Sequence, residues 1–407
     1  MPVKIKYYIA LFFPFFLLFY SESIEIGGLR MSQLWKIPMV GYLMFHLFQH
    51  RRKTTPLWTQ AYYWLSVKHL FNSGCVKNLF VNIQEGISFL FLPLLYNYFQ
   101  NAIKKETVNK ILLCICQYFI LTNIPFLFFG LQTHKQGVEY GDIVGYTGIF
   151  QNQHAMSTIM GICIIVLLYY FKKDEFRNVT VKLYNVLLLC LAAYSMYRGF
   201  ARTGWAMCLL GIFILFLPRN IGVKQWIGTI MVFCVLTGGF GFMMMTNNDF
   251  HDRILDINSV TGKQKDLGSG RADFIANALE LYASGNVFEL AFGKSMKDLK
   301  DYEYEKTGHH ILAHNGFVTL LATDGALGVI IKLLAMSLLL SFIHRRRMCF
   351  SHHAALAFWT MNLSYQLTQG GHVFHSDLLY ALMYCLLQFE HEEEQKMEER
   401  NEVVAYA

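Results

Sequence analysis

Three short motifs in this chain carry residue types that could act on a phosphate-bearing substrate. They are Ala201-Arg202-Thr203, Gly268-Ser269-Gly270-Arg271 and His314-Asn315-Gly316. An arginine guanidinium presents five N–H donors in a planar fork that matches phosphate oxygens. An imidazole with an ordinary pKa of about 6.5 can take a proton from a hydroxyl at neutral pH. These residues therefore suit a site that binds a phosphate and deprotonates a hydroxyl.

Arg271 lies where a predicted helix begins. Residues 271–282 carry apolar side chains along one side, with the period of an amphipathic helix. Gly268 and Gly270 precede this helix, and a helix entered from a glycine-containing turn offers free backbone amides to an anion. The alternative is that Arg271 is a solvated residue at the start of an ordinary amphipathic helix. The residues alone favour neither interpretation.

Arg198 and Arg202 flank a short turn between two apolar segments. A guanidinium at the centre of a bilayer costs about 2.5–3.5 kcal/mol even on a lenient insertion scale, and less near the interface. Either both arginines extend to phospholipid phosphates, or at least Arg202 turns inward to bind a phosphate-bearing ligand. We retain both interpretations.

Histidine spacing and cysteine usage predict no metal site. His310 and His314 lie four residues apart, but the Glu of a metalloprotease pattern does not stand between them. Most of the cysteines lie within apolar segments, with neither a CxxC motif nor a disulfide framework. His314 can alternatively be a histidine that is simply tolerated at a membrane interface.

Composition identifies a polytopic membrane protein. Hydrophobic residues make up 54% of the chain, aromatic residues 16%, and charged residues only 15%, against roughly 25% in soluble domains. The net charge of +7 is explained by basic residues at the cytoplasmic ends of the spans and by anionic lipid. It does not indicate nucleic acid binding.

The apolar runs predict an all-α bundle of about twelve transmembrane helices. Residues 1–407 should form one membrane domain, with an outer helical insertion at 246–313 between helices nine and ten and a cytoplasmic tail at 390–407. The stretch from His314 to Ile343 is too long for one upright helix, so its first part, with Asp324 and Gly325, is expected to be either an interfacial helix or a break. The spans are predicted near residues 7–22, 33–49, 56–73, 81–99, 111–130, 154–171, 183–196, 204–218, 225–245, 316–343, 353–369 and 375–389.

Basic residues predict the orientation of this bundle. Short loops rich in lysine and arginine prefer the cytoplasm, and clusters such as 51–53, 104–110, 172–177 and 345–347 all fall on one side of the predicted map. Both termini are therefore expected in the cytoplasm. The insertion and the turn that carries Arg202 then share the outer face.

The motifs, taken in order, resemble those of the O-antigen ligase and O-antigen polymerase superfamily of bacterial membrane glycosyltransferases. The resemblance covers the chain from roughly residue 130 onward and includes Tyr146-Thr147-Gly148-Ile149-Phe150-Gln151-Asn152-Gln153 before a span. It departs from the family where Ala201 replaces a frequent Ser and His154 replaces a frequent Asn. The second departure leaves open whether Asn152 contacts a ligand or caps a helix.

The resemblance implies a GT-C-like bundle in the bacterial cytoplasmic membrane, with its active site at the outer face. It also implies transfer of a glycan from an undecaprenyl-diphosphate carrier to a sugar hydroxyl, with inversion and without a cofactor or metal. The diphosphate would be bound by Arg202 and Arg271, with Arg198 as a third cation, and His314 would be the general base. Further substrate contacts are expected from Asn152, Gly270 and Asn315.

The acceptor separates two forms of this function. A polymerase extends another carrier-linked repeat unit in O-antigen, capsule or exopolysaccharide assembly, whereas a ligase transfers the glycan to lipid A core of lipopolysaccharide or to another surface acceptor. The modest insertion favours a polymerase. A flippase for lipid-linked oligosaccharides is the alternative from another class. His372, His375 and Asp377 in the last outer turn either line the same cavity or serve packing.

Overall fold

The computed structural model of the protein describes most of the chain between residues 25 and 406. The described ranges are 25–26, 29–49, 55–74, 78–129, 146–150, 152–199, 201–218, 271–308, 312–370 and 374–406, with short pieces between 227 and 246. The predicted first span at 7–22 lies outside the described residues, and most of the predicted span at 225–245 does as well.

The described part is helical apart from one hairpin of two short strands, β1 (Glu25–Ile26) and β2 (Leu29–Arg30). The first seven of its described helices lie between residues 31 and 215. Their bounds are α2 (Met31–Gln49), α3 (Leu57–His69), α4 (Leu79–Ala102), α5 (Lys105–Phe129), α6 (Gln153–Lys172), α7 (Val179–Gly199) and α8 (Arg202–Leu215). The later helices are α11 (Arg271–Ala283), α12 (Val287–Phe292), α13 (Met296–Thr307), α14 (Gly316–His344), α15 (His352–Thr368) and α16 (Phe374–Tyr406).

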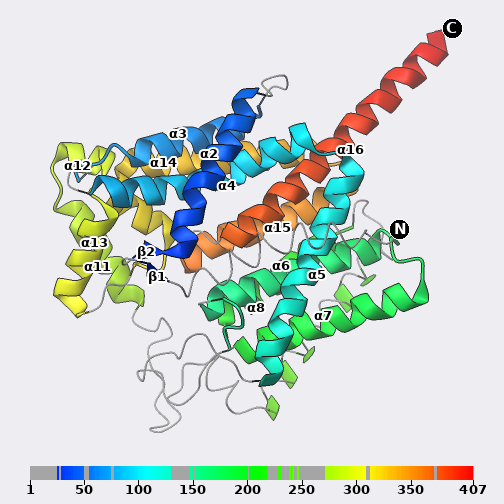
Figure 1. The fold of residues 1–407 in the computed structure, drawn as a ribbon, viewed down its shortest axis with the longest axis horizontal. Helices are drawn as coiled ribbons and strands as arrows, with labels where there is room; N and C mark the ends of the chain where they lie inside the picture. The colour runs from blue at the N-terminus through cyan, green and yellow to red at the C-terminus, as the bar shows by residue number, and fades with distance from the viewer. Residues whose placement is uncertain are drawn as a thin grey trace.

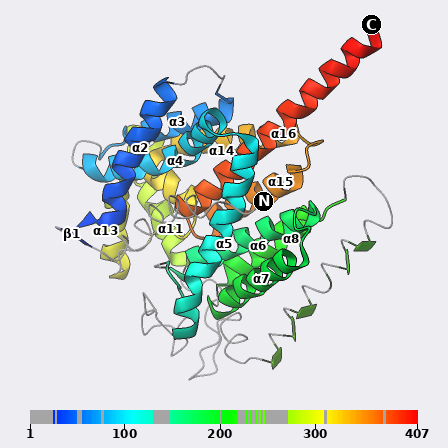
Figure 2. The same ribbon diagram turned by 45° about the vertical axis from the view of Figure 1, so that its right-hand side comes forward.

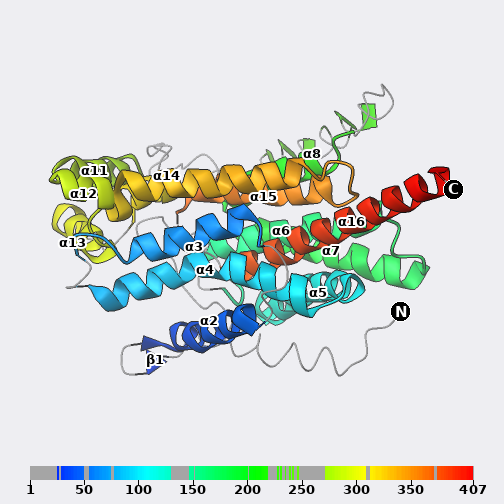
Figure 3. The same cartoon turned by 90° about the horizontal axis from the view of Figure 1, so that it is seen from above.

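Helices α3, α4 and α14 lie side by side roughly along the longest axis of the molecule, whereas α2 and α5 run steeply across it (Figures 1 and 3). Helix α14 packs against α3 and α15, α16 against α4 and α5, and α6 against α7 and α8. The short helices α11, α12 and α13 gather at one end of this bundle, and the last turns of α16 extend beyond the other end (Figures 1 and 2). The two ends of the bundle therefore differ in structure.

An aromatic cluster holds four of the helices together. Trp58 of α3 is buried, and its ring centroid lies 5.0 Å from that of Tyr96 on α4. The rings of Phe342 on α14 and Tyr384 on α16 lie 6.0 and 6.2 Å from Trp58. Buried aromatic pairs at such distances contribute beyond their area alone, so this cluster fixes the relative placement of α3, α4, α14 and α16.

Four described helices are long and apolar enough to cross a membrane: α5, α6, α7 and α14. They indicate a multi-pass membrane protein, but the expected number of twelve spans is wrong for the residues described. Helices α3, α8 and α15 contain 13, 14 and 17 residues, fewer than the roughly 20 needed to span a bilayer. The apolar runs had predicted spans wherever hydropathy was high, without regard to where each helix ends.

Helix α7 shows the surface expected of a lipid-facing span. Its large apolar side chains point outward, with Val179, Leu183 and Leu187 exposed by 71%, 64% and 57%. Monomeric soluble proteins rarely leave apolar patches of this extent uncovered. This face of α7 is therefore consistent with contact with the lipid chains.

Helix α14 is broken at the predicted position. Gly325 has φ +67° and ψ −172° inside the helix, a conformation that favours glycine. The backbone of α12 lies against this break, because a Cβ atom built on Gly325 would be 2.5 Å from the carbonyl carbon of Ala291. The break therefore makes room for the helices of the insertion.

A buried ionic cluster fastens α3 to this break. The Nζ atom of Lys68 lies 3.4 Å from Oδ1 of Asp324 and also donates to the backbone oxygens of Asp324 and Phe292. The His69 Nδ1 atom lies 2.7 Å from Oδ2 of Asp324, which also accepts from the hydroxyl of Thr323. Lys68, His69 and Asp324 form what we call the α3–α14 clamp, which joins the bundle to the end of α12.

The insertion packs onto the bundle through a small apolar core of its own. Ala278 and Leu281 of α11, Leu299 of α13, and Ala313 and Ala322 are buried together. The predicted amphipathic helix at 271–282 is confirmed as α11, which ends one residue later. Because this core includes Ala322 of α14, the described part of the insertion is continuous with the membrane bundle.

Candidate functional site

The last turn of α15 contacts all three of the motifs that the sequence singled out. The Nη1 atom of Arg271 donates to the backbone oxygen of Thr368 at 3.1 Å. The Nδ2 atom of Asn315 donates to the backbone oxygen of Leu367 at 3.1 Å. The Nε2 atom of Gln369 donates to Oγ1 of Thr203 at 2.9 Å. We call this turn, residues 366–370, the α15 junction.

The α15 junction also explains why Gly316 follows Asn315. A Cβ atom at Gly316 would lie only 2.5 Å from Oε1 of Gln366 and 3.4 Å from Cα of Gly370. A side chain at this position would push the Gln366 side chain aside and would crowd the backbone oxygen of Gln366, 3.1 Å away. The glycine permits the close approach that brings His314 to the same place as Arg271.

His314 lies half-buried immediately before α14. Its φ of +48° is in the left-handed region, which is uncommon for residues other than glycine and is often found at functional sites. Its ring centroid lies 6.1 Å from that of Phe274, one turn after Arg271 in α11. The insertion and the start of α14 therefore meet at this imidazole.

Burial, and secondarily the charge of Arg271, lower the pKa of His314 to about 4. The sequence-based expectation of an ordinary histidine pKa is therefore corrected. Both causes act in the same direction, because each disfavours the imidazolium form. At neutral pH the imidazole is uncharged and can accept a proton, but it is a weaker base than expected.

Asn315 has a structural role that the motif did not reveal. Its Oδ1 atom accepts from the backbone N–H groups of Phe317 and Val318 at 3.0 and 3.1 Å, which makes it the N-cap of α14. Its amide nitrogen donates to Leu367, as described above. Asn315 therefore fixes the start of α14 and holds α14 to α15, a role beyond the substrate contact that the resemblance implied.

Arg202 and Arg198 occupy adjacent helix ends. Arg202 is half-buried at the first residue of α8, next to the Thr203 hydroxyl that contacts the α15 junction. Arg198 is exposed in the last turn of α7, and its backbone oxygen accepts from the N–H of Tyr146 at 2.9 Å. Arg202 is thus connected to Arg271 through Thr203 and the α15 junction. Arg198 is connected instead to the segment that begins at Tyr146.

Asn123 of α5 organises that segment and was missed by sequence reasoning. Its Oδ1 atom accepts from the N–H of Ile149 at 3.1 Å, and its backbone oxygen accepts from the Tyr146 hydroxyl at 2.7 Å. Gly148 has φ +57°, and a Cβ atom there would lie 2.0 Å from Asn123 Oδ1. The sequence did contain a signal for this role. Asn123 is a polar residue within a predicted span, and it lies near the same end of that span as the motif that begins at Tyr146.

Asn152 caps α6, which is one of the two roles that the sequence left open. Its side chain accepts from the N–H of His154 at 2.7 Å, as asparagine commonly does at a helix N-terminus. The residue is exposed. The observed geometry therefore assigns Asn152 a capping role.

Of the remaining predicted site residues, two are buried in the bundle and the others lie outside the described residues. His375 is buried at the start of α16, with its ring centroid 5.6 Å from Phe150 and 5.8 Å from Phe119. Asp377 is also buried, so both fit the expected packing role. Gly270, together with Gly268, His310 and His372, lies outside the described residues.

The α3–α14 clamp is the second feature that sequence reasoning missed. Lys68 and His69 belong to one predicted span and Asp324 to another. Because ionisable groups at membrane depth are expensive unless paired, opposite charges in two spans predict an ion pair between them. That signal was present in the sequence.

The structure places Arg271, the neutral imidazole of His314 and the turn that carries Arg202 at the same end of the helix bundle. This arrangement suits the binding of an anionic group beside a proton acceptor. Comparison of the whole chain with models of known protein families and with curated proteins found no match in either.

Proposed function

We propose that this protein is an inverting membrane glycosyltransferase that uses an undecaprenyl-diphosphate-linked glycan as donor. The acceptor would be a sugar hydroxyl, and the reaction would need neither a metal nor a cofactor. The observation that supports this proposal most directly is the α15 junction, which links Arg271, the His314 motif and the Arg202 motif through hydrogen bonds. These residues lie far apart in sequence, and the resemblance had proposed a shared role for them.

In the proposed reaction the acceptor oxygen attacks the anomeric carbon opposite the lipid diphosphate. The bond between that carbon and the diphosphate oxygen breaks, and its electron pair leaves with the diphosphate. The hydroxyl proton passes to the imidazole of His314. Arg271 and Arg202 stabilise the charge that develops on the leaving group, an effect that is large where water is excluded.

The low pKa of His314 suggests that the donor binds before the acceptor reacts. Arg271 contributes to the low pKa of His314 in the free protein. A bound diphosphate would compensate the charge of Arg271 and would raise the pKa of His314 toward its ordinary value. We propose that donor binding thereby makes His314 a stronger base before the acceptor reacts.

The distribution of charge supports placing the α15 junction at the outer face. The opposite end of the bundle carries basic groups in contact with its own partners: Lys105 pairs with Glu393 at 2.5 Å, Lys172 donates to the backbone oxygen of Leu215, and Arg346 donates to Gln388. Basic residues flanking spans favour the cytoplasm. We therefore propose a GT-C-like bundle in the bacterial cytoplasmic membrane, with both termini inside.

Among the acceptors, we propose another carrier-linked repeat unit, which makes the enzyme a polymerase of surface polysaccharide. The described insertion consists of three short helices, of 13, 6 and 12 residues. A small insertion fits an acceptor that shares the membrane and the carrier of the donor. A ligase, which transfers the glycan to lipid A core or another surface acceptor, would use the same residues.

The α3–α14 clamp favours transport as the second candidate function. Broken helices and buried ionisable residues are typical of transporters, but there they lie near the bilayer midplane. Asp324 lies eight residues after Gly316, about 12 Å along α14 at the usual helical rise. The midplane of a hydrocarbon core about 30 Å thick lies about 15 Å from the interface, so this depth is compatible with a transporter. We still propose glycosyl transfer, because the α15 junction links Arg271 to the His314 and Arg202 motifs.

Reconstitution of the purified protein with a lipid-diphosphate-linked repeat unit tests the two candidates. A transferase releases free lipid diphosphate and lengthens the glycan, whereas a flippase changes only the leaflet of the donor. His314→Gly should abolish release and Arg271→Gln should reduce it strongly, while both variants remain folded. His344→Gln and Arg347→Gln, which alter exposed residues at the opposite end, are the matched controls. Full activity in both site variants would contradict the assignment.

A further inference from the structure

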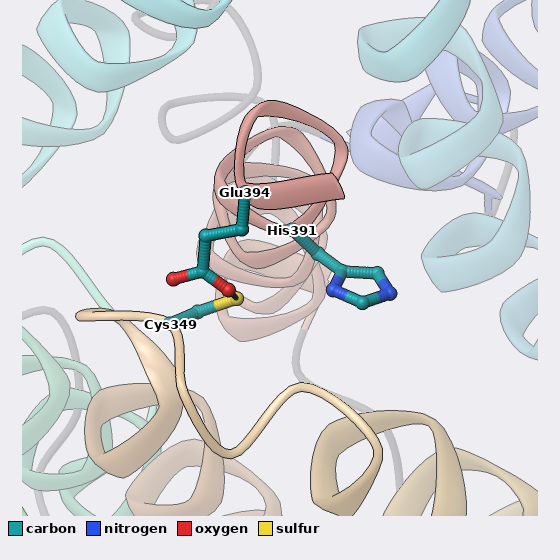
Figure 4. Close-up of side chains that lie close together, drawn as sticks. All are labelled: Cys349, His391 and Glu394. Atoms are coloured by element: carbon teal, nitrogen blue, oxygen red, sulfur yellow. Dashed lines mark hydrogen bonds between the residues drawn. The ribbon is translucent and has the colours of Figure 1, made fainter. Parts of the chain in front are cut away.

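A cluster of metal-ligating side chains lies at the end of the bundle opposite the α15 junction. It consists of Cys349, in the turn between α14 and α15, and of His391 and Glu394 on α16. One ligand atom from each residue lies within 4.8 Å of the other two. Figure 4 shows the Glu394 carboxylate reaching the Cys349 sulfur, with His391 on the same helix. We propose that this cluster is a zinc(II) site.

The cluster is held in place by contacts that need no metal. The sulfur of Cys349 lies 3.4 Å from Oε2 of Glu394. One turn earlier on α16, the Glu390 carboxylate accepts from both the N–H and the hydroxyl of Ser351, each at 2.8 Å. Two positions of the α14–α15 turn thus pair with two successive turns of α16. The turn that carries Cys349 and the part of α16 that carries Glu394 are therefore held together before an ion binds.

The spacing of the ligand atoms is close to what zinc requires. Bond lengths of about 2.3 Å to sulfur and 2.0–2.1 Å to nitrogen or oxygen place tetrahedral ligand atoms about 3.5 Å apart. The Cys349 to Glu394 separation already meets this value. The 4.8 Å limit on the full set means that His391 has to approach by at most about 1.3 Å, which a side-chain rotation can provide.

The chemistry of the ligands selects the ion. A thiolate with an imidazole suits a borderline-soft ion such as zinc, whereas calcium and magnesium prefer oxygen ligands. Binding would release the thiol proton of Cys349 to solvent, so that the thiolate and the Glu394 carboxylate balance the two positive charges of the ion. Three protein ligands leave the fourth tetrahedral position for a water molecule.

An ion can reach this cluster from a cavity of about 750 Å³. His391 lines the cavity, together with Trp58, Phe342 and Arg346. Arg346 is held in the wall of the cavity, because it donates to Gln388 and stacks on Phe342 with its guanidinium carbon 3.6 Å from the ring centroid. The cavity therefore gives His391 access to solvent while the thiol of Cys349 remains buried.

The site would connect the end of α16 to the turn between α14 and α15. Helix α16 continues for twelve residues after Glu394, from residue 395 to residue 406, and its last turns project from the bundle (Figure 1). A zinc ion would fasten the base of this projection to two helices that also form the α15 junction. This inference is independent of the proposed transferase activity, because it concerns the opposite end of the bundle.

Zinc titration of the purified full-length protein, first stripped of metal with a chelator, tests the proposal. We expect one zinc per chain, measured by elemental mass spectrometry after gel filtration. Cys349→Ser, His391→Gln and Glu394→Gln should each weaken binding by at least about 100-fold, since even the loss of an outer-shell partner costs roughly 10–100-fold. Cys190→Ser, His344→Gln and Glu398→Gln are matched controls that should bind as the parent does.

Cobalt(II) provides a second measurement that does not depend on the folding of any variant. Cobalt bound to a thiolate gives a strong charge-transfer absorption in the near ultraviolet, and this band should appear in the parent protein and disappear with excess zinc. The proposal is overturned if the parent shows no such band. It is also overturned if folded Cys349→Ser and His391→Gln bind zinc as tightly as the parent.

Discussion

The guanidinium of Arg271 donates to the backbone oxygen of Thr368, which lies 97 positions later in the chain. This bond joins the first residue of α11 to the last residue of α15. It places a cation from the insertion at the end of a bundle helix. The relationship between Arg271 and His314 follows from it, because α15 also holds the start of α14.

Gly316→Ala should disrupt the α15 junction. The added methyl group would meet the side chain of Gln366 at 2.5 Å, and such overpacking typically costs about 1–3 kcal/mol. We expect a lower unfolding temperature and a larger loss of transferase activity than of stability. Gly41→Ala is the matched control, since nothing lies within 4 Å of its Cβ position. Equal activity in the two variants would show that the close approach at Gly316 is unimportant.

The pH dependence of kcat/KM should reflect the low pKa of His314. A base is active when it is neutral, and His314 in the free protein gains its proton only near pH 4. Since kcat/KM reports groups of the free enzyme, its acid limb should lie near pH 4. An acid limb at the ordinary histidine value of about 6.5 would contradict the role of His314 or its environment.

Arg271→Gln should move that acid limb upward. Removing the positive charge of Arg271 makes protonation of His314 easier, which raises its pKa, although burial is the larger cause of the shift. The displacement should therefore be partial and should be measurable in residual activity. In the parent protein, the acid limb of kcat should lie above that of kcat/KM, because bound diphosphate compensates Arg271. Coincident limbs for kcat and kcat/KM would exclude this coupling.

Lys68→Met should destabilise the protein strongly. The change leaves Asp324 buried opposite an uncharged side chain, and breaking a buried ion pair in this way costs about 3–5 kcal/mol. Adding Asp324→Asn should recover part of the stability, because it removes the remaining charge. Thermal unfolding in detergent measures both effects. Lys306→Met, which breaks the exposed pair with Glu280, should change stability little.

Cysteine labelling in intact cells should reveal the orientation. Val287 in the insertion and Met348 at the opposite end are exposed by 85% and 73%. A membrane-impermeant thiol reagent should label Val287→Cys from outside, and Met348→Cys only after the cells are permeabilised. The parent protein supplies the background from its native cysteines. The reverse pattern would place the α15 junction in the cytoplasm and remove the basis of the proposed reaction.

Local sequence patterns predicted several features of the fold correctly. The amphipathic period located α11, and the excessive length of one span located the break at Gly325. Both features depend on residues close together in sequence. The count of spans was wrong partly because α3, α8 and α15 end too early. Helices α2, α4 and α16 are long enough, but they are not among the four described helices that are also apolar enough to cross a membrane.

The candidate site was only partly predictable. Arg271 and His314 were chosen by residue type and motif, and the structure brings their segments together. Their meeting point could not be predicted, because Arg271 and Asn315 bond to backbone oxygens of α15, which every residue carries. The predicted pKa of His314 was wrong for a related reason, because the burial that lowers this pKa depends on the tertiary fold.

The backbone oxygens that accept hydrogen bonds from Arg271 and Asn315 lie at the C-terminal end of α15. The last four carbonyl groups of any α-helix lack partners within the helix, and Leu367 and Thr368 are the final two residues of α15. The side chains of the candidate site therefore act as the C-terminal cap of that helix. Fraying of a single turn would separate Arg271 from His314 while the bundle stayed intact, so inactivation on heating should precede global unfolding.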